Sequence, residues 1–132
     1  MILTTFTEEQ LLSELVIDYK RIKRIAKNKA DAYLFKAKKS GRFIRDTEYE
    51  SYTIKTVLNN KWNVEIEYDQ RKKIPWLFRA CSIIESDKKT KDYYIVRGVN
   101  SNKPYYIKIT SHALKRFKDR NNDQYAVLLS IW

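Results

Sequence analysis

The chain has 132 residues, a net charge of +11 and a hydrophobic content of 43%, which together predict one folded, basic domain. One cysteine cannot form an internal disulfide, which favours a reducing cytoplasm. One cysteine and one histidine together also exclude a structural zinc site within a single chain. No apolar run reaches the roughly 20 residues that span a membrane, and the first residues lack the pattern of a signal peptide. With two glycines the usual phosphate-cradling loops are absent, so we expect no cofactor and assign no metal ligands.

The positive charge is concentrated in one segment. Residues 20–45 contain eleven Lys and Arg against one acid, whereas the rest of the chain has sixteen basic and fifteen acidic residues. Such clustering favours a polyanionic partner, either nucleic acid or an anionic surface. The alternative is a basic helix that only keeps the protein soluble. The residues that we expect to contact nucleic acid are Lys20, Arg21, Lys23, Arg24, Lys27, Arg97 and Lys108.

Residues 1–40 carry the signals of helical structure. Thr7 and Gln10 have the spacing of a capping box, and apolar residues then recur at helical intervals as far as residue 39. Gly41 is expected to end this helical stretch. A stretch of this length is compatible with one long helix or with two helices that are separated near 28–31, and we prefer two.

From residue 46 the apolar period changes to two, which predicts strands. They are expected at 49–58, 62–69, 76–85, 93–99 and 105–109. Their short connections favour an antiparallel meander over 46–110.

Three further features of this predicted sheet allow a functional or a structural interpretation. Glu65 and Glu67 share one strand face and could perform acid–base chemistry or bind a metal, but a solvated face is the preferred interpretation. Cys81 lies in an apolar run and is expected to be a buried thiol. The tyrosine pairs at 93–94 and 105–106 place one tyrosine per pair where it could stack on a base beside a cation, although tyrosine is also simply a good strand residue.

Residues 110–120 hold the only histidine, and they predict a helix that Thr110 or Ser111 caps. At about 100° per residue, His112, Arg116 and Arg120 form one row beside an apolar sector of Ala113, Leu114 and Phe117. Two arginines and an imidazole in one row could hold a phosphate and move a proton. They could equally form the solvated flank of a packed helix.

The pattern His112-Ala113-Leu114-x-Arg116-x-x-Asp119-Arg120 resembles a His-Ala-Leu-x-Arg-x-x-Glu-Arg motif of small toxin-like proteins, which are grouped with the RelE-type and BrnT-type ribonuclease toxins. The resemblance covers about ten to twenty residues. It implies that His112 acts as a general acid or base, and that Arg116 and Arg120 bind the scissile phosphate.

These observations predict a single α+β domain: one or two N-terminal helices, an antiparallel sheet of about five strands, and short C-terminal helices over 111–132. The expected function is binding of RNA or another single-stranded nucleic acid, with toxin-like ribonuclease activity as a further hypothesis. The alternative is a non-enzymatic interaction module, with a protein partner or a homodimer docked through the apolar segment 125–132. That segment packs as a final element, or else the chain is a piece of a longer protein.

Overall fold

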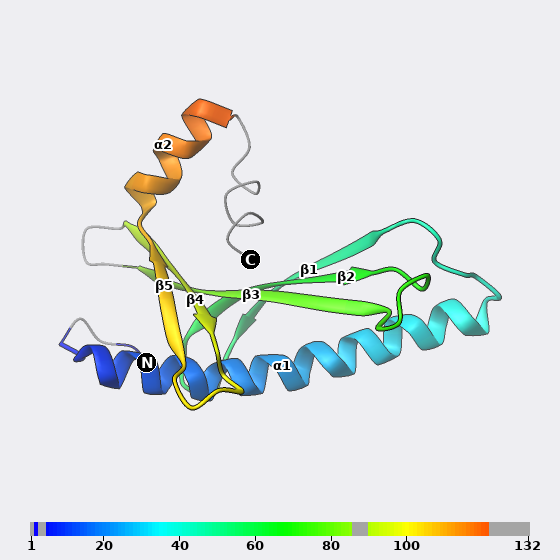
Figure 1. Ribbon diagram of the computed structural model, residues 1–132, viewed down its shortest axis with the longest axis horizontal. Coiled ribbons are helices and arrows are strands. Elements are labelled where there is room, and N and C mark those ends of the chain that lie inside the picture. Colours follow the sequence, from blue (N-terminus) through cyan, green and yellow to red (C-terminus); the bar gives the residue numbers. More distant parts are fainter. Residues whose placement is uncertain (1, 3–4, 86–89, 122–132) are drawn as a thin grey trace.

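The computed structural model describes residues 2, 5–85 and 90–121, and the side chains at 117, 118, 120 and 121 lie outside that description. A long helix lies along one face of a five-stranded sheet, and a short helix follows the last strand (Figure 1). This is the expected α+β arrangement. The elements in chain order are α1 (Glu8–Lys39), β1 (Glu48–Lys55), β2 (Lys61–Tyr68), β3 (Trp76–Glu85), β4 (Lys91–Arg97), β5 (Tyr105–Ile109) and α2 (Ser111–Asn121).

Helix α1 is continuous for 32 residues, so the preference for two helices was wrong. Its start is the predicted capping box, in which Gln10 N–H donates to the Thr7 hydroxyl and Thr7 N–H donates to the Gln10 side chain. Within the stretch proposed as a break, Ala30 is fully buried. A continuous helix keeps Ala26, Ala30 and Ala37 buried against the sheet. This packing outweighs the weak helix preference of Asn28 and Asp31. The chain leaves the helix at Gly41, whose φ is +70°.

The strands form an antiparallel meander in the order β1-β2-β3-β4-β5, which confirms the predicted topology. The first hairpin turns at 56–60, slightly before the predicted 59–61, with Asn59 in the left-handed region. Strand β3 pairs with β2 along 76–83 but with β4 only through 82–85. Strands β4 and β5 therefore diverge from the first three, and their connecting turn reaches α1 (Figure 1).

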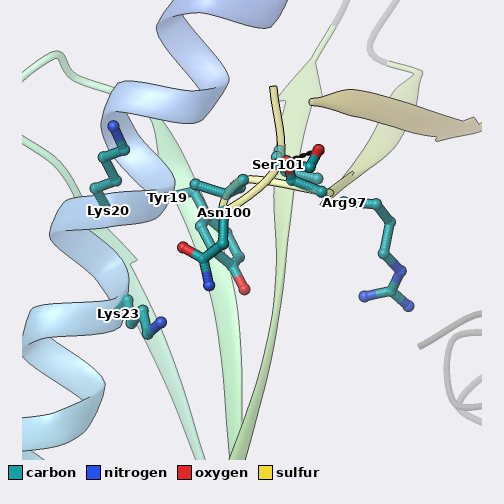
Figure 2. Close-up of a pocket in the computed structure, with 9 residues that line it drawn as sticks. Tyr19, Lys20, Lys23, Arg97, Asn100 and Ser101 are labelled. Atoms are coloured by element: carbon teal, nitrogen blue, oxygen red, sulfur yellow. Dashed lines mark hydrogen bonds between the residues drawn. The ribbon is translucent and has the colours of Figure 1, made fainter. Parts of the chain in front are cut away.

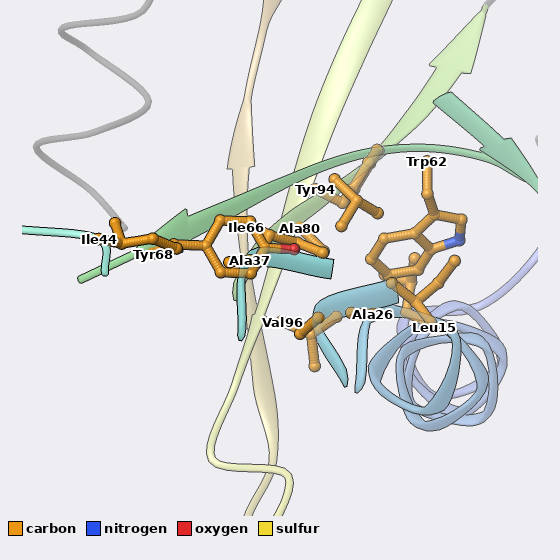
Figure 3. Packing of buried hydrophobic residues seen from close by; sticks show 13 residues of the cluster. Leu15, Ala26, Ala37, Ile44, Trp62, Ile66, Tyr68, Ala80, Tyr94 and Val96 are labelled. Atoms are coloured by element: carbon orange, nitrogen blue, oxygen red, sulfur yellow. The ribbon is translucent and has the colours of Figure 1, made fainter. Parts of the chain in front are cut away.

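The main core lies between α1 and one sheet face (Figure 3). Leu15, Ile22 and Ala26 from the helix are fully buried against the sheet, as are Trp62 and Tyr68 of β2. Burial of each large apolar side chain stabilises the fold by about 1.5–3 kcal/mol. This packing fixes the rotation of α1, and with it the direction in which each helix charge points.

A second, smaller core lies on the opposite sheet face. It comprises Cys81, Ile95 and Ile109 together with Leu114 of α2. Ala113 is exposed, contrary to the sequence interpretation, because α2 reaches this core through Leu114. The two helices therefore cover opposite faces of the sheet. Among the described residues, no helix has the length and apolar character that a membrane span requires.

Candidate nucleic-acid interface

A hollow of about 480 Å³ lies between α1 and the turn that joins β4 to β5. Three of the predicted contact residues, Lys20, Lys23 and Arg97, line it. The polar residues Tyr19, Asn100 and Ser101 complete its wall (Figure 2). No described residue that lines the hollow is acidic. The site therefore combines positive charge with groups that can form hydrogen bonds.

Lys20 and Lys23 reach the hollow because the apolar stripe of α1 sets the helix rotation. Ile22 and Ala26 are buried, so the neighbouring positions 20 and 23 fall on one exposed flank. Figure 2 shows Lys23 extending from the helix toward Asn100, whereas Lys20 points along the helix. Lys27 is exposed one helical turn beyond Lys23 and continues the same flank.

The opposite wall is a turn with an internally bonded backbone. Gly98 has a φ of +67°, and both the N–H and the hydroxyl of Ser101 donate to its carbonyl, at 3.0 and 2.7 Å. The Lys103 N–H donates in turn to the Ser101 hydroxyl at 3.2 Å. A Cβ at Gly98 would lie 3.0 Å from that hydroxyl oxygen, and the positive φ is strained for other residues, so glycine is favoured there. These bonds hold Asn100 over α1.

Tyr19 forms the base of the hollow and is held by aromatic packing. Its ring centroid lies 5.6 Å from that of Phe78 and 6.5 Å from that of Trp62. Burial raises the pKa of its phenol, and the positive charge of Arg97 partly opposes that shift. The phenol is consequently neutral near pH 7 and can donate a hydrogen bond.

The other flank of α1 carries charges with a structural role. Asp18 is fully buried, and its Oδ2 accepts hydrogen bonds from Thr56 Oγ1 at 3.0 Å, Asn60 Nδ2 at 2.6 Å and Trp62 Nε1 at 3.2 Å. Arg21 Nη1 lies 4.0 Å from the other carboxylate oxygen. Arg21 thus faces the β1–β2 hairpin and not the hollow, although the sequence grouped it with its neighbours.

The remaining predicted contact residues are dispersed. Arg24 is exposed on α1 away from the hollow. The guanidinium of Arg97 points away from the α1 lysines in Figure 2. Lys108 is on β5, where it lies 3.7 Å from Asp92 and above the ring of Tyr94.

The four tyrosines of β4 and β5 have different environments. Tyr94 is buried and Tyr93 and Tyr106 are half-buried, whereas Tyr105 is 55% exposed. Tyr105 pairs across the ladder with Arg97, which is the arrangement expected for a stacking residue beside a cation.

The His112 row lies apart from the hollow. His112 and Arg116 are exposed on α2, across the sheet from α1 (Figure 1). The backbone of Arg120 belongs to the same helix, but its side chain lies outside the described residues. Because His112 is exposed, it is not a buried histidine that is hydrogen-bonded in the core. The row and the lysine flank therefore do not form one surface, and segment 125–132 also lies outside the described residues.

Other candidates for chemistry have structural roles. Arg79 bridges Glu65 and Glu67, at 3.3 and 2.9 Å, so the paired carboxylates neutralise an arginine. Cys81 is buried, as expected, and burial raises the pKa of its thiol to about 12. Among the described residues, no cluster of three or more His, Cys, Asp or Glu side chains could hold a metal ion.

Sequence reasoning missed Tyr19 and the Asn100 turn as parts of the hollow, and it missed Asp18 as a buried charge. One local signal was available: Gly98, one of only two glycines, directly follows a strand and precedes Asn100 and Ser101. A single acid between Ile17 and Tyr19, on the edge of the apolar stripe, was a weaker signal for Asp18. The meeting of α1 with a turn almost eighty residues later had no local signal.

No family model matches the chain, and the comparisons with curated proteins and with solved structures find no match either.

Proposed function

We propose that this protein binds single-stranded nucleic acid, with RNA favoured, along the flank of α1 that faces the hollow. The observation that carries the proposal is the meeting of Lys20 and Lys23 with the β4–β5 turn, in a hollow whose described lining contains no acid. Positive charge that only keeps a protein soluble does not need a polar turn packed opposite it. Phosphates attract these cations, and release of their counterions supplies affinity. The one cysteine is buried as a thiol, which suits a reducing cytoplasm.

The test is the salt dependence of binding to a short fluorescent single-stranded RNA, measured by anisotropy. Replacing Lys20, Lys23 and Lys27 with Ala should weaken binding and reduce the slope of log K against log salt by about 2, because each phosphate contact contributes about 0.7 for single strands. Since all three positions lie off the buried stripe, the melting temperature should remain unchanged.

The matched control removes the same charge from the first hairpin and the start of β4. Lys55, Lys61 and Lys91 are exposed, and their replacement with Ala lowers the net charge equally. This control should retain the wild-type slope. Equal losses in both variants would mean that overall charge, and not the α1 flank, drives binding, and would contradict the proposal.

Cleavage of the bound strand remains a separate hypothesis, based on the row of His112, Arg116 and Arg120. If it is correct, His112→Ala should reduce cleavage of single-stranded RNA by about 10²–10⁴-fold with binding nearly intact. Because His112 is exposed, its replacement should change stability by less than about 0.5 kcal/mol. Cleavage that persists in this variant would refute the hypothesis and leave the binding proposal standing.

A further inference from the structure

The hollow has two properties that attraction to a phosphate chain does not require: the volume of a small-molecule site and a partly apolar lining. Its volume of about 480 Å³ lies within the range of about 300–1,000 Å³ that is usual for small-molecule sites. Apolar Val99, which is half-buried, lines it beside the two lysines, together with Val96, which is only 2% exposed. A purely electrostatic surface needs no apolar wall, whereas a nucleotide presents a flat base with apolar faces beside its phosphate.

Asn100 is the group in this wall that is placed to recognise a ligand. The hydrogen bonds of Ser101 to Gly98 and Lys103 are satisfied within the turn. The Asn100 side chain, by contrast, is exposed, and among the described residues it has no hydrogen-bond partner. Figure 2 shows its amide directed toward the space beside Tyr19 and Lys23. Its donor and acceptor are both available, as recognition of a base edge requires.

We propose, on the basis of the function proposed above, that the hollow is a subsite for one unpaired nucleotide of a single strand. Lys20 and Lys23 attract its phosphate, the half-buried Val99 contacts its base, and the Asn100 amide pairs with the base edge. A base within a duplex is stacked and has its pairing edge occupied, so it cannot enter. The subsite therefore selects single strands over duplexes, and nucleotides over polyanions that lack bases.

The experiment compares three probes that carry the same number of phosphates: a short single-stranded RNA, an RNA duplex of half its length, and inorganic polyphosphate. The wild-type protein should bind the single strand about tenfold more tightly than either of the others at one salt concentration. Asn100→Ala should remove most of that preference, because one good base-edge contact corresponds to about tenfold in affinity. Its salt slope should remain that of the wild type, since no charge is lost.

Asn102→Ala is the matched control, because Asn102 is exposed on the same turn and does not line the hollow. It should bind all three probes as the wild type does. An Asn100→Ala protein that keeps the wild-type preference, or a wild type without preference, would overturn the subsite while salt-dependent binding through α1 survives. If none of the three probes is bound in a salt-dependent manner, the proposed function and the subsite are both overturned. Thermal melting of each variant confirms that the compared proteins are folded.

Discussion

The two flanks of α1 carry charges only a few residues apart, with opposite roles. On one flank Asp18 is buried, and it accepts three hydrogen bonds from the β1–β2 hairpin while Arg21 lies beside it. On the other flank Lys20 and Lys23 line a hollow whose described lining contains no acid. The first set of charges stabilises the fold, and the second set is available to a ligand. The comparison shows that the role of a charge depends on what packs opposite it, because neighbouring positions of one helix face different surroundings.

The largest expected effect comes from the buried flank. Asp18→Ala would leave the Thr56 hydroxyl, the Asn60 amide and the Trp62 indole N–H without their acceptor inside the protein. We expect the free energy of unfolding to fall by about 3–5 kcal/mol, measured by urea denaturation. Asp31→Ala, at an exposed position of the same helix, should change it by less than about 0.5 kcal/mol. Similar values for the two variants would show that the Asp18 cluster does not stabilise the fold.

The turn that faces the lysines should be the next most sensitive element. Gly98→Ala places a side chain at a φ of +67° and against the Ser101 hydroxyl, so it should destabilise the protein by about 2 kcal/mol and weaken RNA binding. Gly41 has a similar φ of +70° but open space around it. Gly41→Ala should therefore cost about 1 kcal/mol and leave affinity unchanged. A loss of affinity in Gly41→Ala would indicate a general effect of destabilisation and not a role of the turn.

A direct comparison of the flanks uses two single substitutions. Arg21→Ala removes the cation beside Asp18 and should lower stability by about 1 kcal/mol with little change in affinity. Lys23→Ala should leave stability unchanged and weaken binding of single-stranded RNA by about fivefold, which corresponds to about 1 kcal/mol. Urea denaturation and anisotropy on the same preparations provide both quantities. The division between the flanks is wrong if the two variants lose affinity equally.

The smallest effect concerns a charge pair in the turn between β2 and β3, Asp69 and Arg71, which belongs with the structural charges. Arg71 donates side-chain hydrogen bonds to both carboxylate oxygens and lowers the pKa of Asp69 to about 2. The folded protein therefore binds fewer protons than the unfolded chain, whose carboxyl has its ordinary pKa of 3.8. The stabilisation is complete above that value and is lost as the pH falls toward about 2.

Asp69→Asn removes this proton-linked contribution. Its melting temperature should decrease less than that of the wild type between about pH 5 and about pH 2. Arg71 is 58% exposed on its side chain, so added salt should reduce the difference between the two proteins. If the melting temperatures of wild type and variant change equally over that pH range, the ionised Asp69 does not stabilise the fold.

The sequence by itself determined which stretches of the described chain are helical or extended, and the order of the strands. The capping residues Thr7 and Gln10 predicted the start of α1, Gly41 predicted its end, and the alternating patterns predicted five strands in a meander. These features depend on neighbours within a few residues, so local periodicity and turn chemistry are sufficient to identify them. The cluster of basic residues was evident for the same reason.

Only the tertiary structure decided which charges are exposed to a ligand. The continuity of α1 through Ala30, the burial of Asp18 and the meeting of Lys23 with Asn100 all depend on how the helix packs across a sheet that begins after it. The separation of His112 from the lysine flank depends on α2 covering the opposite face. Composition and spacing carry no information on these long-range contacts, because the same periodic pattern is compatible with many packings of helix on sheet.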